Sequence, residues 1–250
     1  MQAKPVIWRN GNVQELPTFG GDPDGQASAI NEIGQAVGTS GLCIGIAPDQ
    51  HHALLWQDGT VTDLGNFGGI DHNVAFDISN QGQVVGSSGL PANTDLSFHA
   101  FLWQNGVMTD LGTLPGDVAS LAEGINSKGQ VVGGSFDKNG NNRAFLWQNG
   151  VMTDLNTLIP ADSPLFLIEA FSNNSRGQIA GVALQTSTNE VHGFLLTPSH
   201  GHGPGENATL AARGEASQRP KVVLPEHVRE MVRQRLSDRF RIPGLRMPKD

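Results

Sequence analysis

Four carboxylates recur at one position of a repeated segment, and their spacing makes them the first candidates for chemistry. They are Glu15, Asp63, Asp110 and Asp154, each at the end of an expected strand. Two such groups at a suitable separation can act as the acid and base of a glycosidase. However, a position that is filled in every repeat serves the architecture, because a single active site must break the symmetry of the repeats. We therefore interpret these carboxylates as acceptors for amides at strand ends.

Residues that interrupt the repeat are better candidates, and one interrupting loop resembles a calcium site. Asp137, Asn139 and Asn141 place oxygen-bearing side chains at positions one, three and five, as in an EF-hand loop. The glycine expected at position six is Asn142, and the closing glutamate is Gln148. We keep the first three residues as calcium-loop candidates and favour a plain polar turn.

Four further side chains that can bind metals lie close together in the second repeat: His51, His52, Asp71 and His72. Their spacing does not match a metal-ligand motif. His99 stands in the next repeat where His52 stands in this one. We therefore interpret His52 as a structural residue, and we expect no cofactor.

These candidates belong to a segment that is written four times along the chain. Each copy has one tryptophan, at Trp8, Trp56, Trp103 and Trp147. Each tryptophan is followed by a Gly-Gln-x-x-Gly block, whose final residues are Gly38, Gly86, Gly133 and Gly181. These glycines are separated by 48, 47 and 48 residues. A period of this length indicates a solenoid, a propeller or a similar array.

Each period contains four expected strands, which are clearest in the third copy. Residues 100–103 and 107–111 flank Asn105-Gly106, a dipeptide that adopts positive φ at low cost and closes a two-residue hairpin. After a connection with glycine and proline, residues 120–126 and 130–135 are expected to form the next two strands. The repeating unit is thus two hairpins in series.

Adjacent apolar residues in these strands require that both faces of each small sheet leave water. Phe101 and Leu102, like Val131 and Val132, point to opposite faces of a strand. Sheets stacked on both sides meet this need, and four antiparallel strands per period match a β-propeller blade. A β-sandwich, the competing architecture, would alternate apolar with polar residues. We predict an all-β fold: a β-propeller-like array of four four-stranded repeats, closed or an arc of a larger ring, with a C-terminal helical tail.

The predicted repeat domain covers residues 4–198. Its units are 4–50, 51–97, 98–142 and 143–191, and a fifth copy of the first strand, residues 192–197, could close the ring. The four tryptophans are expected to lie in the core between blades, because they stand inside apolar strands. The four final glycines are expected to belong to the same repeat core.

The third copy also shows a family pattern. It reads His99-Ala-Phe-Leu-Trp, then Asp110-Leu-Gly-Thr-Leu, then Ile125-Asn-x-x-Gly-Gln-Val-Val-Gly. This pattern resembles the bacterial HAF repeat, over about residues 5–198. The resemblance implies an extracellular bacterial repeat protein without assigned catalytic residues. The fourth copy departs from the pattern, with Arg143 in place of the opening histidine.

Composition and charge narrow the function classes. The 250 residues include 32 glycines and a single cysteine, Cys43, which excludes an intrachain disulfide framework. Residues 1–198 contain 6 basic and 18 acidic side chains, whereas residues 199–250 contain 10 and 6. An acidic body argues against non-specific nucleic-acid binding, which needs cations that neutralise phosphates. We find neither a signal-peptide pattern nor a run of membrane-spanning length, so the secreted or cell-surface location comes from the resemblance alone.

The basic tail is predicted to form a flexible linker, residues 199–224, and a helix, residues 225–242. A proline and an acid stand at the start of the helix, and Pro-Gly follows its end. Its apolar side carries Val228, Val232, Leu236 and Phe240. The five arginines of the helix could dock on the acidic body, a membrane surface or an acidic partner.

These features favour a non-catalytic binding or scaffolding module that uses rim loops and ring faces, with an unknown protein or glycan as partner. We expect no enzymatic activity. The alternative is a propeller-type enzyme, a glycan hydrolase or lyase, with Asp71, Asp117 or Asp162 near the mouth of the ring. An unequal pair of carboxylates about 5–10 Å apart at a central pocket would favour that alternative.

Overall fold

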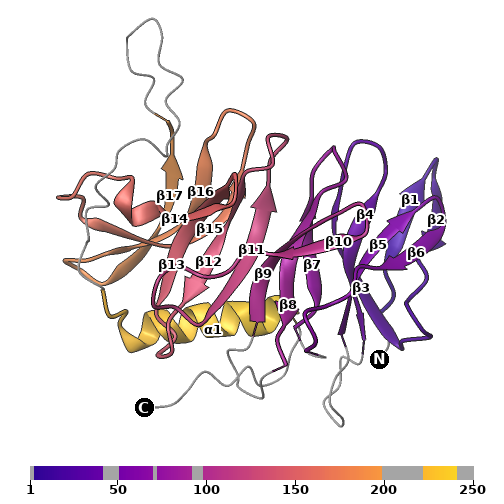
Figure 1. The fold of residues 1–250 in the computed structure, drawn as a ribbon, viewed down its shortest axis with the longest axis horizontal. Helices are drawn as coiled ribbons and strands as arrows, with labels where there is room; N and C mark the ends of the chain where they lie inside the picture. Colours follow the sequence, from indigo (N-terminus) through magenta and orange to yellow (C-terminus); the bar gives the residue numbers. More distant parts are fainter. Residues whose placement is uncertain (1–2, 42–50, 70–71, 92–97, 199–221, 241–250) are drawn as a thin grey trace, which may run out of the picture.

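The structure is a computed structural model that describes residues 3–41, 51–69, 72–91, 98–198 and 222–240, with side chains as far as Arg235. In these ranges the chain forms 17 strands, the short 3-10 helix η1 (Leu155–Thr157) and the helix α1 (Glu226–Phe240). The strands make five antiparallel sheets that lie side by side in a row (Figure 1). The predicted all-β, propeller-like array with a C-terminal helix is therefore confirmed.

Three sheets have four strands each, hydrogen-bonded in chain order. Sheet B contains β3 (Asp24–Ile30), β4 (Ala36–Gly41), β5 (His51–Gln57) and β6 (Thr60–Asp63). Sheet C contains β7 (Val74–Ile78), β8 (Val84–Gly89), β9 (Phe98–Gln104) and β10 (Val107–Asp110). Sheet D contains β11 (Ala119–Ile125), β12 (Val131–Phe136), β13 (Asn142–Gln148) and β14 (Val151–Asp154). The expected hairpin turn is present between β9 and β10, where Asn105 and Gly106 have φ values of 51° and 85°.

The two end sheets are smaller. Sheet A contains β1 (Val6–Arg9) and β2 (Asn12–Glu15), and sheet E contains β15 (Leu165–Asn173), β16 (Ile179–Gln185) and β17 (Glu190–Leu196). Sheets A and E lie at opposite ends of the row (Figure 1), and no strand pairing joins them within the described residues. The array is therefore open. The prediction that residues 192–197 close a ring is wrong, because β17 pairs with β16 as the outer strand of sheet E.

The sheets are out of phase with the sequence units 4–50, 51–97, 98–142 and 143–191. Each complete sheet takes the last two strands of one unit and the first two strands of the next. The reason is visible in sheet D, where the tight turn between β12 and β13 is closed by the Asp137 amide donating to the Asn141 carbonyl (3.0 Å). The connection between β10 and β11 instead leads from one sheet to the next. The unit boundaries are thus wrong as blade boundaries.

Neighbouring sheets pack face to face through four apolar layers. Trp56 is 2% exposed between sheets A and B, and its indole donates a hydrogen bond to the Pro17 carbonyl (2.7 Å). Trp103 and Trp147 are half-buried in the next two layers. Trp8 is 68% exposed, so its predicted core position is wrong. In the part of the chain that the structure describes, no sheet precedes sheet A to cover it.

The helix α1 runs below sheets C, D and E (Figure 1) and packs on their first strands. These strands, β7, β11 and β15, are adjacent to one another and share one apolar cluster with the helix. Leu224, Val228 and Val232 are buried in that cluster. The helix falls within the range 225–242 expected for it. The predicted linker lies outside the described residues from 199 to 221, and the linker assignment is wrong for Leu224, which is 1% exposed.

The one helix among the described residues is too short and too polar to cross a membrane.

Candidate functional site

Two buried carboxylates lie on neighbouring first strands, beneath α1. Glu123 on β11 and Glu169 on β15 have side chains that are 0% and 1% exposed. Burying a carboxylate costs several kcal/mol unless a cation and hydrogen bonds compensate for the lost water. A buried acidic pair therefore needs a basic group that enters the same space.

Arg235 of α1 supplies that group. Its Nη1 lies 2.8 Å from Oε2 of Glu169, and its Nη2 lies 3.4 Å from Oε1 of Glu123. Its guanidinium also stands over the ring of Phe171, 3.5 Å from the ring centre. Such a cation–π contact is strengthened where water is excluded. One arginine thus joins the helix to two sheets, since Glu123 belongs to sheet D and Glu169 to sheet E.

The start of α1 is fixed by the turn that resembles a calcium loop. The Leu224 amide donates to Oδ1 of Asn141 (2.9 Å), and Nη1 of Arg229 donates to the Asn139 carbonyl (3.3 Å). Asp137 Oδ1 accepts the backbone amides of Asn139 (2.9 Å) and Asn141 (3.0 Å). The candidate oxygens therefore serve the turn and the helix, and the loop does not present them together to a cation. Among the described residues, no group of three or more His, Cys, Asp or Glu side chains is placed to hold a metal.

The carboxylate register has the predicted role at three of its four positions. Asp63, Asp110 and Asp154 accept backbone amides two residues further on, from Gly65, Gly112 and Asn156, at 2.9, 2.7 and 2.9 Å. Each also pairs across its hairpin with the second residue of the preceding strand. These pairs are His52–Asp63 (2.9 Å), His99–Asp110 (2.9 Å) and Arg143–Asp154 (3.0 Å). The structural interpretation of His52 is consistent with this pairing.

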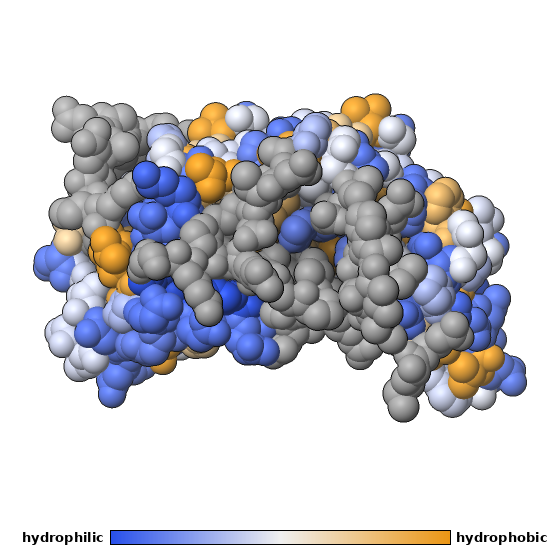
Figure 2. Space-filling model, turned by 90° about the horizontal axis from the view of Figure 1, so that it is seen from below, coloured by the Kyte–Doolittle hydropathy of each residue, from blue (hydrophilic) through white to orange (hydrophobic). Residues whose placement is uncertain are grey.

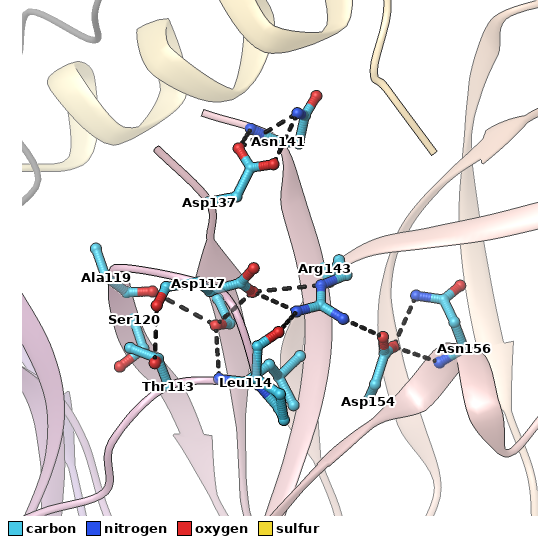
Figure 3. Close-up of polar contacts among 12 residues, drawn as sticks. Thr113, Leu114, Asp117, Ala119, Ser120, Asp137, Asn141, Arg143, Asp154 and Asn156 are labelled. Carbon is cyan, nitrogen blue, oxygen red and sulfur yellow. Dashed lines mark hydrogen bonds and ion pairs between the residues drawn. The ribbon is translucent and has the colours of Figure 1, made fainter. Parts of the chain in front are cut away.

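Arg143 extends this pairing, as Figure 3 shows. Its Nη2 lies 2.8 Å from Oδ2 of Asp117, whose side chain is 1% exposed, while its Nη1 binds Asp154. The same guanidinium donates to the Pro115 carbonyl (3.2 Å). Arginine in place of the usual histidine thus ties the connection between sheets C and D to the outer hairpin of sheet D.

The His99–Asp110 pair makes stability depend on pH. Burial raises the pKa of Asp110, but hydrogen bonds from His99 and the Gly112 amide outweigh burial, so the net pKa is below its ordinary value. A carboxyl with a lowered folded-state pKa stabilises the fold above its unfolded pKa, about 3.9, and loses this effect as the pH falls through the folded value.

We expect Asp110→Asn to lower the free energy of unfolding at pH 6 by less than about 1 kcal/mol, because Asp110 is 43% exposed. The difference from the unmodified chain should begin to shrink below about pH 4 and should vanish as the pH falls through the lower folded-state pKa. Urea unfolding at several pH values between about 3 and 6, roughly the range in which carboxylates titrate, measures this difference in free energy. A difference that stays constant across this range would refute the assignment.

Of the three residues named for the enzymatic alternative, the structure describes Asp117 and Asp162, and it places them in different surroundings. Asp117 is held by Arg143, and Asp162 is exposed in the connection that follows η1. Asp71 and Cys43 lie outside the described residues. His51 is buried, and the His72 ring stacks on Phe98 with 5.1 Å between ring centres.

Glu123 and Glu169 were missed by the sequence analysis, although the repeat contains a signal for them. The residues at the position of Glu123 in the other copies are Ser28, Phe76 and Phe171. The residues at the position of Glu169 are Gln26, Val74 and Leu121. Both glutamates therefore break the repeat inside a strand, which is where a unique site on a symmetric array is expected.

The fold and the site define an open array of propeller-type sheets with a helix bound across its first strands. No family model matches the chain, and no curated protein matches it. Three solved structures are similar to it in part. An acylaminoacyl peptidase of Pyrococcus horikoshii has 14% identity and a TM-score of 0.45, over 74% of this chain and 27% of that one.

The second structure is the β-propeller domain of the Trilobed protease of Pyrococcus furiosus. It has 10% identity and a TM-score of 0.45, over 74% of this chain and 54% of that one. The third is a gluconolactonase from Xanthomonas campestris. It has 14% identity and a TM-score of 0.37, over 77% of this chain and 68% of that one. The chain thus spans 27% of the first of these proteins and 54% of the second.

Proposed function

We propose that this chain is a non-catalytic binding module that holds a basic helix across the first strands of its open β array. The observation that carries the proposal is the position of Arg235 between the buried Glu123 and Glu169. In this chain the helix is its own tail. A partner helix with the same pattern, two apolar residues four apart and an arginine three residues later, would meet the same contacts.

Three kinds of contact support recognition of a helix rather than general adhesion. Val228 and Val232 fill the apolar part of the face, and Asn141 accepts the backbone amide of Leu224 at the helix start. Arg235 supplies the charge at the other end. Apolar anchors at one helical face together with a charge-assisted hydrogen bond are a recurring mode of helix recognition.

We also propose that the chain is a HAF-repeat protein. The family pattern opens on a histidine and later has an aspartate, and in this chain His52 contacts Asp63 and His99 contacts Asp110 at hydrogen-bond distance. The pattern continues with Ala-Phe, and Ala100 and Phe101 are buried on opposite faces of β9. The pairing gives a physical reason for residues that the pattern repeats.

A cleavable tail tests the binding proposal in the folded chain. A protease site placed among residues 199–221 allows the chain to be cut after folding, and the release of the tail is then followed by gel filtration. We expect Arg235→Ala to weaken retention by about 1.5–3 kcal/mol, as for a hydrogen bond to a charged group.

Arg233→Ala is the matched control, because Arg233 pairs with Glu230 of the helix itself. It should weaken retention less than Arg235→Ala does, since this pair lies within the helix, its glutamate is 55% exposed, and such a pair contributes less than about 1 kcal/mol. A synthetic peptide of residues 220–242 should displace the cut tail, and the same peptide with alanine at 235 should not. Equal release by the two arginine variants would contradict the proposal.

A further inference from the structure

The apolar layers between sheets follow one rule. In sheets C and D, the face that meets the preceding sheet carries an aromatic pair, such as Phe101 and Trp103 of sheet C. In sheets B and E, the same face carries one aromatic residue of the strands, Trp56 or Phe194. The face that meets its successor carries small and aliphatic residues, such as Val85, Ala100 and Leu102 of the same sheet. Each interface therefore joins two different faces, and the same two kinds of face meet again between sheets B and C and between sheets C and D.

At the beginning of the row, no sheet in the described part of the chain covers the aromatic-type face. Val6, Trp8 and Val13 of sheet A stand at the positions of Phe101, Trp103 and Met108 in sheet C, and they are 47%, 68% and 52% exposed. Ile30 of sheet B is also exposed, because the two-stranded sheet A does not reach it. Figure 2 shows hydrophobic surface at this end of the molecule, on the right.

At the other end, none of the described residues forms a sheet that covers the aliphatic-type face of sheet E. Leu195 and Ala180 stand at the positions of Leu102 and Val85, which are packed against sheet D. Leu195 is 66% exposed, and Ala180 is exposed as well. The two kinds of face that meet at each internal interface are thus both uncovered in the described chain, one at each end of the row.

We propose that these two faces bind each other between copies of the chain, so that sheet A of one copy packs on sheet E of the next. The contact repeats an interface that already exists inside the molecule, with Trp8 and Leu195 in one layer, as Trp147 and Leu102 are in the layer between sheets C and D. Because the two faces differ, the association is head to tail and continues to a closed ring of copies or to longer chains. The proposal does not depend on the helix-binding function.

The test is sedimentation velocity of the full chain over a wide range of concentration. The unmodified chain should associate as its concentration rises, and Trp8→Glu or Leu195→Glu should weaken this association at least about tenfold, as expected for a central residue of an interface. Val107→Glu is the matched control, because Val107 is 64% exposed on β10 and belongs to neither end face. It should associate like the unmodified chain.

A mixture of the two variants identifies the geometry. Trp8→Glu retains an intact sheet E face and Leu195→Glu an intact sheet A face, so the mixture should form dimers that neither variant forms alone. An unmodified chain that stays monomeric at all concentrations overturns the proposal. Self-association of Leu195→Glu alone also overturns it, because it would mean that like faces meet. Circular dichroism of each variant confirms that the sheets remain folded.

Discussion

Replacing Gly133 with alanine is expected to cost about 3 kcal/mol or more of folding free energy and to disrupt sheet D. A Cβ at this position would lie 2.0 Å from the Leu121 carbonyl oxygen and 3.0 Å from Cε1 of Phe145. The first contact is with the backbone of the neighbouring strand, and the second is with a ring that is fully buried. Neither can move without disturbing the layer between sheets C and D.

Gly193→Ala is the matched control. Gly193 also lies inside a strand, but the nearest atom to its Cβ position would be the Gly181 carbonyl oxygen at 3.9 Å, an ordinary contact. Three of the other four copies have alanine here, at Ala53, Ala100 and Ala144, and the first copy has Pro5. The variant should be neutral or up to about 1 kcal/mol more stable, because alanine restricts the unfolded chain. Urea unfolding followed by circular dichroism compares the two, and equal losses would refute the steric explanation.

The same contact explains why glycine ends each Gly-Gln-x-x-Gly block. At Gly38, Gly86 and Gly181 a Cβ would meet the opposite carbonyl at 1.9, 1.9 and 2.0 Å. A bulge lies beside each of these positions in the first strand of the sheet, as between Ala122 and Gly124 in sheet D. The sequence predicts that these glycines belong to the repeat core. It does not show the close approach, because the bulge arises from pairing between strands.

Strands and hairpins were predictable because their signals are local. Asn105-Gly106 specifies its turn, and adjacent apolar residues such as Phe101 and Leu102 specify a strand buried on both faces. Which four consecutive strands form one sheet was not predictable in the same way, because the period of a tandem repeat is the same wherever its unit is taken to begin. The short turn of residues 137–141 was the available signal, because it is tight enough to join two strands of one sheet.

The candidate site was harder to predict because it joins distant segments. Glu123 and Glu169 are 46 residues apart, and Arg235 follows them after a further 66. Departure from the repeat marks the two glutamates, whereas the helix that covers them is outside the repeat. Their burial depends on where α1 lies, and this position is set by tertiary contacts such as Leu224 with Asn141.

Trp56→Ala is expected to lower the free energy of unfolding by about 3–5 kcal/mol, as for other buried tryptophans. The indole is 2% exposed between sheets A and B, so its loss leaves a cavity and removes the hydrogen bond to Pro17. Trp8→Ala is the internal control, because Trp8 stands at the same position of the repeat and is 68% exposed. It should change stability by less than about 0.5 kcal/mol in the monomer.

The two tryptophans share their place in the repeat and their pairing partner type, since Trp8 pairs with Val13 and Trp56 with Val61. What differs is the sheet that covers Trp56 and the absence of such a cover over Trp8 in the described chain. Thermal unfolding at low protein concentration measures the difference between the variants. If both substitutions lower the free energy of unfolding equally, the tryptophan at this position stabilises its own hairpin, and packing between sheets is not what stabilises the array. If only Trp56→Ala is costly, each sheet is stabilised by its neighbours, as expected for an array of small sheets that cannot bury their own apolar faces.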